Sequence, residues 1–363
     1  MPAVSPPIKH VALLGATGYT GIEMARLLDA HPFFHIDALS SQQHANRPLH
    51  SLWHGAPDTL PTLQTYEALQ DAIEQGRYDV VFACLPHQTS HHILKSVSHK
   101  SLIIDLSADF RLNSAVLYET WYKNKHSAPA MLSDFVYGLT EIYRPQIQKT
   151  RLLANPGCYP TAALLPLLPL LLEGLVEPSP IIIDAKSGAS GAGRQASTAF
   201  SFCEVSEDIR PYALEGHRHS AEIKEHIERA SASTPKGHHK ETPLHILFTP
   251  QVVACRRGIL ATIYCHAKRD ITPQHITHAL AQYFHDEPFV HVTTQQRIPS
   301  MREARHSNRC VIGVSPKSDG PWITLVSVID NLLKGACGQA LQNANLMCGY
   351  DETCGLPMTP PAL

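Results

Sequence analysis

Three glycines at intervals of three residues follow the first apolar stretch of the chain. Gly15, Gly18 and Gly21 come directly after a β-type stretch at 8–14 and open an amphipathic stretch at 19–30. In a βαβ unit with this spacing, the first glycine makes the tight turn and the second lets the backbone approach a pyrophosphate. The third lets the helix pack closely on the sheet. The pattern therefore predicts a parallel sheet with a dinucleotide at its edge.

The rest of the first third keeps the same alternation of short apolar and amphipathic stretches. It predicts strands at 8–14, 34–39, 79–84 and 102–106 and helices at 19–30, 66–75 and 90–98. After residue 158 the apolar stretches lengthen, with strands expected at 181–186, 244–253, 259–266 and 322–329 and a final helix at 331–347. We expect an α/β protein, with a Rossmann-type parallel sheet domain over residues 1–155 and an α+β domain over 156–330.

Composition excludes several classes of protein. The formal net charge is -2 and no long basic run occurs, which argues against a nucleic-acid partner. The most apolar stretch, 164–172, is far shorter than a membrane span and contains Pro166 and Pro169. The start of the chain does not resemble a signal peptide, and the nine cysteines form no CxxC pair, so we expect reduced thiols and a cytoplasmic location.

Histidine is abundant, with 23 residues, and two adjacent pairs occur at His91-His92 and His238-His239. Neither pair has the ligand spacing of a zinc site, and the second lies in a polar stretch, 233–240, that predicts a solvated loop. We therefore expect no metal site.

Cys158 is the leading candidate for a reacting group. It follows an expected strand at 150–154 and the turn residues Pro156 and Gly157, and it precedes a strongly apolar helix at 159–172. The amides and dipole of a helix N-terminus stabilise a thiolate, which is the nucleophilic form of cysteine. A buried, inert cysteine is the alternative.

Other segments offer groups that an acyl-transfer reaction through a thiol needs. His217 and His219 flank Arg218 just before an expected helix at 221–230, and either imidazole is a candidate acid and base. Arg111 ends the run 105–111, which follows the fourth strand, where it can clamp a carboxylate or phosphate. The Ser/Gly-rich run 187–194 can bind phosphate through its amides.

The end of the second strand indicates which nicotinamide cofactor is bound. NAD enzymes place an acidic side chain there for the ribose 2'-hydroxyl. Here Asp37 lies earlier in the strand, and the strand ends at Ser40 and Ser41, with Arg47 nearby. Uncharged hydroxyl groups suit a 2'-phosphate, so we predict NADP(H).

Nine ordered segments together resemble one known family. They are GATGYTG (15–21), LPH (85–87), DLSADFRL (105–112), YGLTE (137–141), NPGCYPT (155–161), DAKSGASGAGR (184–194), HRHSAEI (217–223), RGILATIY (257–264) and VIDNLLKGACGQALQN (328–343). They cover most of the chain and resemble the N-acetyl-gamma-glutamyl-phosphate reductase family, within the aspartate-semialdehyde dehydrogenase-like superfamily. One departure is Ala221, where the family usually has proline.

The resemblance implies an oxidoreductase of arginine biosynthesis. It implies NADPH-dependent reductive dephosphorylation of N-acetyl-L-glutamyl 5-phosphate to the 5-semialdehyde through a Cys158 thioester, with the acid/base role open between His217 and His219. A related acyl phosphate, carrier-linked aminoadipyl or glutamyl phosphate or aspartyl phosphate, is the alternative substrate.

The resemblance also implies that segment 331–363 completes the first domain and that the second domain forms the contacts of a homo-oligomer, a dimer or a tetramer. The substrate residues are then Ser107, Arg111, Asn155, Ser187 and Gly188. The cofactor residues are then Gly15, Thr17, Gly18, Tyr19, Thr20, Gly21, Ser40, Ser41, Pro86 and Asn331.

Overall fold

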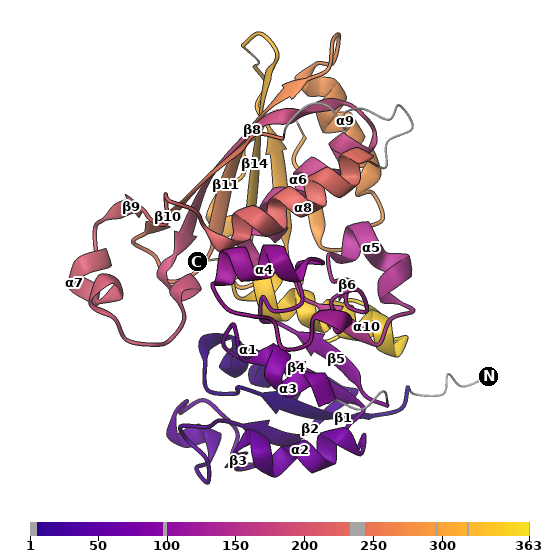
Figure 1. Ribbon diagram of the computed structural model, residues 1–363. Coiled ribbons are helices and arrows are strands. Elements are labelled where there is room, and N and C mark those ends of the chain that lie inside the picture. Colours follow the sequence, from indigo (N-terminus) through magenta and orange to yellow (C-terminus); the bar gives the residue numbers. More distant parts are fainter. Residues whose placement is uncertain (1–5, 97–99, 233–243, 295–296, 318, 363) are drawn as a thin grey trace. The chain divides into compact units, whose positions relative to one another are not determined.

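The computed structural model describes residues 6–96, 100–232, 244–294, 297–317 and 319–362. The chain divides into two compact units (Figure 1). The first comprises Met1–Pro156 and Ala336–Leu356, and the second comprises Gly157–Gly335 and Pro357–Leu363. The chain therefore passes between the units immediately before Cys158.

A parallel sheet forms the centre of the first unit. Within the described residues its strand order is β3-β2-β1-β4-β5-β7-β6, and each pair of neighbours is parallel. The strands are β1 (Lys9–Leu14), β2 (Phe34–Ser40), β3 (Leu63–Gln64), β4 (Val80–Ala83), β5 (Leu102–Asp105), β6 (Val136–Tyr137) and β7 (Leu152–Ala154). The helices are α1 (Tyr19–Asp29), α2 (Tyr66–Glu74), α3 (Ser90–Ile93), α4 (Ala115–Tyr122), α5 (Thr140–Ile147) and α10 (Gly338–Cys348).

The middle strands of this sheet are covered on both faces. All four residues of β4 are fully buried, as are Val11 to Leu14 of β1. Such continuous apolar strands are typical of a parallel sheet with helices on both sides. α10, from the end of the chain, packs against α1, α5 and β5 and so contributes a helix to a sheet built by the first part of the sequence.

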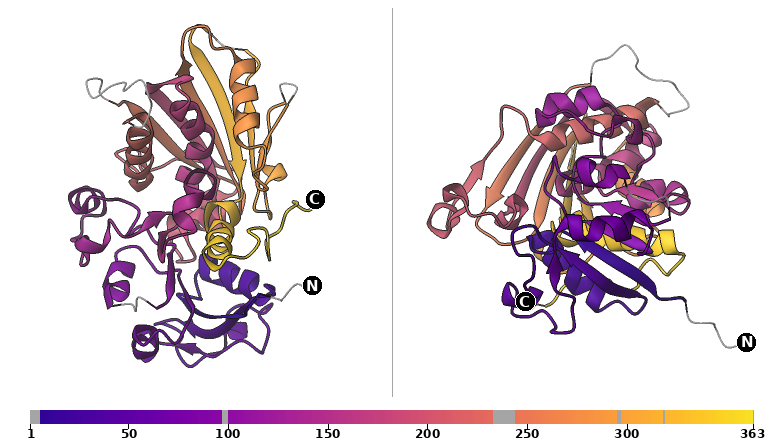
Figure 2. Two further views of the ribbon diagram at one scale, coloured as in Figure 1. Left: turned by 90° about the vertical axis from the view of Figure 1, so that its right-hand side faces the viewer. Right: turned by 60° about the horizontal axis from the view of Figure 1, so that its bottom comes forward.

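A mixed sheet of longer strands forms the second unit (Figure 2). Its order, within the described residues, is β12-β13-β14-β11-β8-β10-β9. The strands are β8 (Val176–Gly188), β9 (Ile209–Pro211), β10 (Ile246–Val253), β11 (Ile259–Ala267), β12 (Val290–Val292), β13 (Cys310–Val314) and β14 (Trp322–Ile329). The helices are α6 (Cys158–Leu172), α7 (Phe202–Val205), α8 (Arg218–Ala232) and α9 (Pro273–Tyr283).

α6 is the central helix of the second unit. It packs against β8, β11 and β14 and against α8 and α9. Its leucines and alanines are buried all around the helix, so it has no polar face. Along β11, alternate residues are buried and half-buried, because helices cover one face of the sheet. The segment with α7 and β9 projects from the sheet edge (Figure 1).

The predicted α/β class is confirmed, and the expected strands and helices occur with shifts of a few residues. The strand expected at 181–186 is longer, since β8 spans Val176–Gly188, and the helix expected at 90–98 is α-helical only over Ser90–Ile93. Two further elements begin differently. α8 starts at Arg218 rather than at 221, so His219 lies in its first turn. The expected helix at 331–347 begins with a π-helical turn, Leu333–Cys337, before α10. The stretch 233–240, which the sequence predicts to be a solvated loop and which includes His238 and His239, lies outside the described residues. No helix in the described parts of the chain is both long and apolar enough to span a membrane.

Candidate functional site

Cys158 is the first residue of α6, as the turn chemistry predicts. The N-cap residue, Gly157, provides no side-chain cap, and Pro160 in the first turn has no N–H to offer. The amides of Cys158 and Tyr159 are thus the donors at this helix end. Space around the thiol depends on Gly335, because a Cβ there would lie 2.8 Å from the Cβ of Cys158. Cys158 itself is half-buried, and the remaining eight cysteines are also free thiols.

Hydrogen bonding and burial fix the protonation of one candidate histidine, His217. The backbone N–H of His219 donates to Nδ1 of His217 over 3.1 Å. Nδ1 is therefore an acceptor, and a neutral His217 carries its proton on Nε2. Burial, together with the positive charge of Arg218, lowers the pKa of His217 to about 4. His217 is consequently neutral at pH 7.

Aromatic side chains surround these imidazoles. Tyr159 packs edge-on against His217 and His219, with ring centroids 5.7 and 5.9 Å apart. Tyr212 donates its hydroxyl proton to the hydroxyl of Tyr159 over 3.0 Å, and Tyr159 donates to the carbonyl of Gln251. Burial raises the pKa of Tyr159 and brings that of Tyr212 to about 12. Both phenols stay protonated and hold His217 in an apolar environment.

The Ser/Gly-rich run 187–194 begins at the end of β8. Ser187 is buried and its hydroxyl donates to the carbonyl of Gly188. A Cβ on Gly188 would lie 2.7 Å from the amide nitrogen of Arg257, so only glycine fits there. Asn331 joins two loops: its Oδ1 accepts from the N–H of Gly258 and its Nδ2 donates to Ser190. Asn331 therefore connects the Ser/Gly-rich run to the loop of Gly258 within the second unit.

The glycine loop of the first unit has the form that the sequence predicts for a dinucleotide site. Gly15 has a φ of +77°, and a Cβ there would clash with the carbonyl of Cys84. Its amide donates to Oγ of Ser40 over 3.1 Å, and Thr17 bonds to Ser41. Gly18 caps α1 without a side chain, so the helix end presents backbone amides. These residues fit the pyrophosphate of a dinucleotide; Tyr19 and Thr20 follow in the first turn of α1, and Pro86 is exposed.

The expected substrate residues of the first unit are held by hydrogen bonds. Arg111 donates through Nε to the carbonyl of Asn155 (2.7 Å) and through Nη2 to the carbonyl of Leu106 (2.9 Å). The side chain of Asn155 is buried and donates to the carbonyl of Ala336. Ser107 is buried as well and donates to Asp105. These bonds bring Arg111 and Asn155 together and fix the end of β5.

Asp109, which the sequence analysis did not single out, organises the loop that follows β4. Its carboxylate accepts from the amides of Gln88 (2.8 Å) and His91 (3.2 Å) and from the hydroxyl of Tyr118 (2.9 Å). It also acts on its neighbour: burial, together with the charge of Asp109, raises the pKa of Asp105 to about 6. The signal in the sequence is a pair of carboxylates, Asp105 at the end of β5 and Asp109 four residues later.

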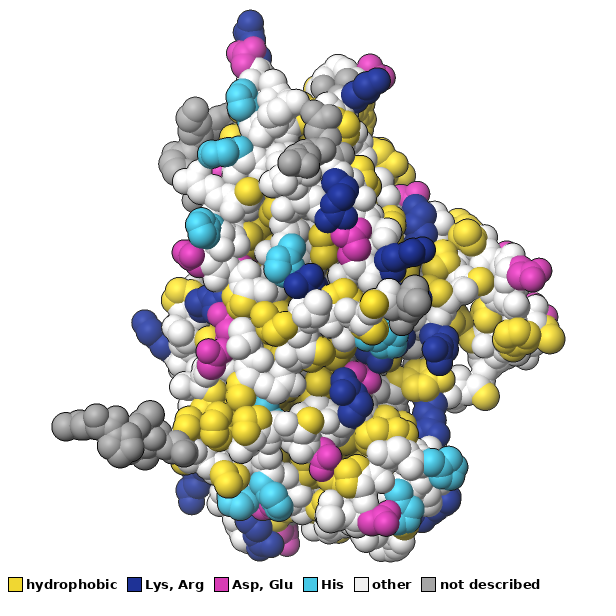
Figure 3. All heavy atoms as spheres, turned by 180° about the vertical axis from the view of Figure 1, so that it is seen from behind, with side chains coloured by type: hydrophobic (Ala, Val, Ile, Leu, Met, Phe, Trp, Pro, Cys, Tyr) yellow, Lys and Arg dark blue, Asp and Glu magenta, His cyan; other side chains and the backbone are white. Residues whose placement is uncertain are grey.

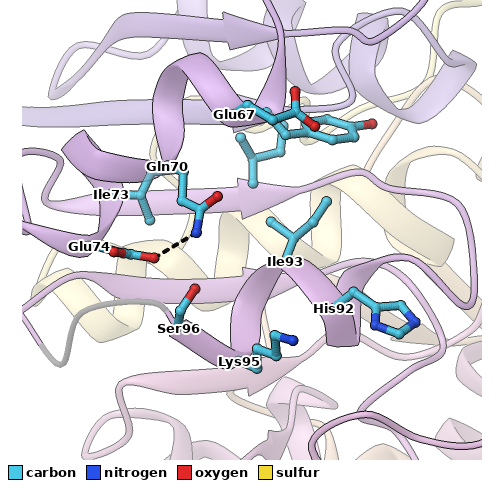
Figure 4. A pocket seen from close by; sticks show the side chains of 10 residues that line it. Glu67, Gln70, Ile73, Glu74, His92, Ile93, Lys95 and Ser96 are labelled. Carbon is cyan, nitrogen blue, oxygen red and sulfur yellow. Dashed lines mark hydrogen bonds between the residues drawn. The ribbon is translucent and has the colours of Figure 1, made fainter.

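A separate cavity of about 130 Å³ lies between α2 and α3 (Figure 4). Leu14, Ile73 and Ile93 provide its apolar lining. Glu67 and Glu74 stand at its polar side, where Gln70 donates to Glu74 over 2.8 Å. Lys95 also lines the cavity, so its charged groups have both signs.

One group in the described residues has side chains that metals use. His10 and His35, from the paired strands β1 and β2, both contact Asp37, at 2.8 and 2.6 Å. Each carboxylate oxygen is taken by one imidazole, and all three residues are exposed. Hydrogen bonding therefore accounts for this arrangement. On the face shown in Figure 3, acidic and basic side chains are scattered over the surface.

Two family models match the chain, and their boundaries fall close to those of the two units. The model described as "Semialdehyde dehydrogenase, NAD binding domain" matches residues 10–150. The model described as "Semialdehyde dehydrogenase, dimerisation domain" matches residues 158–331.

Relatives match over nearly the full chain. N-acetyl-gamma-glutamyl-phosphate reductase of Desulfotalea psychrophila is 42% identical, over 96% of this chain and 98% of its own. A probable chloroplastic N-acetyl-gamma-glutamyl-phosphate reductase of Arabidopsis thaliana is also 42% identical, over 97% of this chain and 84% of its own.

Solved structures show the same fold. Aspartate semialdehyde dehydrogenase II of Vibrio cholerae, complexed with ASA, superposes with a TM-score of 0.67 at 16% identity, covering 94% of this chain and 98% of that chain. Aspartate semialdehyde dehydrogenase of Candida albicans, with NADP, gives 0.64 at 17% identity, with the same coverage of the two chains.

Proposed function

This chain belongs to the N-acetyl-gamma-glutamyl-phosphate reductase family, and from that premise we propose that it reduces N-acetyl-L-glutamyl 5-phosphate to the 5-semialdehyde in arginine biosynthesis. The observation that carries the proposal is the position of Cys158 at the N-terminus of α6, on the helix that packs against the helix bearing His219. A helix N-terminus that carries a half-buried thiol, on a helix packed against one that bears a histidine, suits a reacting thiolate.

Cys158 acts as the nucleophile. Its thiolate attacks the acyl carbon, phosphate leaves, and a thioester remains on the sulfur. NADPH, when bound, supplies the hydride that reduces this thioester. In this proposal the amides of Cys158 and Tyr159 at the start of α6 stabilise the oxygen of the tetrahedral intermediate, which is worth about 3 kcal/mol per donor in enzymes that use such a site. Collapse of the hemithioacetal releases the aldehyde and restores the thiolate.

His219 is the acid and base in this proposal. The developing alkoxide takes a proton in the reduction step and returns it at collapse, so the group must change its protonation near neutral pH. His217 does not suit this role, because its Nδ1 accepts from the amide of His219 and its pKa is lowered to about 4. His217 instead donates through Nε2, and it orients the substrate.

The remaining assignments follow the expected roles. In the first unit, Arg111 holds an anionic group of the substrate, and Ser107 and Asn155 shape its loop. In the second unit, Ser187 and Gly188 shape the Ser/Gly-rich run that binds substrate in this proposal. The glycine loop 15–21 holds the cofactor phosphates, with Ser40 and Ser41 at the end of β2 favouring NADP(H). Pro86 and Asn331 complete the cofactor residues in the proposal.

We also propose that the protein is a homo-oligomer, a dimer or a tetramer. The second unit matches a model described as a dimerisation domain. Its projecting segment exposes large apolar side chains: Phe202 is 80% exposed and Ile209 and Leu214 are each 66% exposed. Light scattering on the purified chain measures the mass directly. The cytoplasmic location stays a prediction.

Phosphate-dependent reduction of NADP+ by N-acetyl-glutamate 5-semialdehyde, followed by absorbance, tests the function. Aspartate semialdehyde and NAD+ serve as the comparison substrate and cofactor. We expect activity that requires phosphate, the acetylated aldehyde and NADP+. Activity with aspartate semialdehyde alone would contradict the proposed substrate, and a preference for NAD+ would contradict the cofactor.

A further inference from the structure

A buried carboxylate reaches the turn that carries the thiol. Glu222 lies on α8 and is only 2% exposed. Its Oε1 accepts a hydrogen bond from the N–H of Gly157 over 2.8 Å. Gly157 is the N-cap residue of α6 and directly precedes Cys158. Burying a carboxylate is costly unless it is hydrogen bonded, and this bond offsets part of that cost.

The same helix carries the candidate acid and base. His219 and Glu222 are three residues apart on α8, and side chains at this spacing share one helix face. That face is turned to α6, against which α8 packs. The Tyr159 ring, next to Cys158, contacts the ring of His219, so the two groups flank one small region.

We propose that Glu222 is a positioning residue that holds the turn of Cys158 at a fixed place relative to His219. The inference rests on the proposed function of these two groups. The carboxylate ties the backbone next to the nucleophile to the helix that carries the proton-transfer group, so that both move as one body. A misplacement of about 1 Å between reacting groups can cost about 100-fold in rate, which is the scale on which such a tie matters.

The negative charge of Glu222 disfavours a nearby thiolate, so it works against the nucleophile whose position the side chain helps to fix. A carboxylate near a helix N-terminus opposes the stabilisation that the helix dipole gives to a thiolate. Glu222 therefore does not activate Cys158, and its contribution is geometric. A glutamine at this position keeps an oxygen that accepts from Gly157 and removes the charge, which separates the two effects.

The test compares Glu222→Gln and Glu222→Ala with Glu228→Ala, a control on the exposed side of the same helix. Glu228 is 55% exposed and pairs only loosely with Lys224, at 3.8 Å. Two measurements are made on each folded variant: kcat and KM with N-acetyl-glutamate semialdehyde, phosphate and NADP+, and the pH midpoint for alkylation of Cys158 by iodoacetamide. A Cys158→Ala background identifies the alkylation that belongs to this thiol.

We expect Glu222→Gln to keep kcat within a few-fold and to lower the alkylation midpoint by about half a pH unit or more. Glu222→Ala should lower kcat about 100-fold with little change in KM, while the control changes neither quantity. Turnover retained in Glu222→Ala would overturn the positioning role, and so would an equal loss in both variants. An alkylation midpoint that neither variant moves would show that the carboxylate is not beside the thiol. If the unmodified enzyme is inactive with this substrate, the proposed function fails, and the alkylation midpoints still decide whether Glu222 lies against Cys158.

Discussion

In the proposed reaction, Cys158, His217 and His219 of the second unit have different roles. Cys158 occupies a helix end that lacks a side-chain cap, and His219 occupies the first turn of a second helix. His217, which looks equivalent in the sequence, is fixed as an acceptor and is kept neutral by burial. His217 precedes α8 and His219 lies inside it, and the spacing of the two residues in the sequence does not show this difference.

Replacing Cys158 tests the covalent route. We expect Cys158→Ala to lower turnover by at least about 10³-fold, because the thioester cannot form. NADPH binding, followed by fluorescence, should be unchanged, since the glycine loop is intact. Cys255→Ala, at another half-buried thiol, is the control and should retain activity. Substantial reduction of substrate by Cys158→Ala would contradict a thioester intermediate.

Replacing the two histidines separates their roles. His219→Asn should lower kcat about 10²- to 10⁴-fold and remove one limb of the pH–rate profile, because the proton donor is lost. His217→Asn should raise KM more than it lowers kcat, because an amide still donates a hydrogen bond. Initial rates from pH 5.5 to 9 measure both effects. The reverse pattern would assign the acid/base role to His217.

At the scale of elements, a helix from the end of the chain secures the site residues of the first unit. Asn343 on α10 donates to the carbonyl of Gly138 (2.7 Å) and accepts from the hydroxyl of Thr140 (2.7 Å). It also lies 3.4 Å from the side chain of Asn155, whose carbonyl accepts from Arg111. Buried polar side chains thus link α10 to the turn that positions Arg111.

Asn343→Ala should destabilise the first unit by about 2–4 kcal/mol, because two buried partners lose their hydrogen bonds. Urea unfolding followed by fluorescence measures the change. Met347→Ala, at a half-buried position of the same helix, is the comparison and should cost markedly less. Equal costs would show that packing, rather than the polar network, holds α10 in place.

The π-helical turn before α10 could not be predicted, although its position could. The apolar spacing from 331 to 347 predicts one continuous α-helix. A π-helical turn differs from an α-helical turn by only one residue in its hydrogen-bond spacing, so a single such turn leaves no separate signal in the apolar pattern. The short strands β3, β6 and β9 were missed for a related reason. Two or three residues carry no periodic signal, and their pairing depends on tertiary contacts.

At the scale of the whole molecule, stability depends on buried histidines that must stay neutral. Burial lowers the pKa of His31 and His91 to about 4 and that of His226 to about 3, from an ordinary value of 6.5. The unfolded chain therefore binds more protons than the folded one below pH 6.5, so this stability is present above that pH and is lost as the pH falls. Asp105, with its pKa raised to about 6, has the opposite sign and offsets part of the loss below pH 6.

Each of the three histidines should remove about 1 kcal/mol of unfolding free energy between pH 6.5 and 5.5. Urea midpoints at pH 7.5 and 5.5 measure the total. In His226→Leu the midpoint should fall less between these two pH values than in the unchanged protein, because one proton-binding group is gone. An unaltered pH dependence in this variant would show that His226 is not kept neutral in the folded state.

How much the sequence predicts depends on whether a residue acts through its neighbours in the chain or through distant contacts. The glycine loop, the first strands and Cys158 follow from local patterns, because turn geometry and helix starts depend on neighbouring residues. Asp109, Glu222 and Gly335 could not be found in this way. Their roles arise from contacts with Gln88, Gly157 and Cys158, across long stretches of chain that only the fold brings together.

The passage of the chain through both units also governs how it can be made. Residues 336–356 belong to the first unit, although residues 157–335 of the second unit are translated before them. A nascent chain that has completed its parallel sheet must wait, with the surface for α10 uncovered, until the last helix leaves the ribosome. A gene that ends after residue 156 would encode a first unit whose surface for α10 is never covered. A soluble first unit therefore requires the final segment, supplied by fusion or as a peptide.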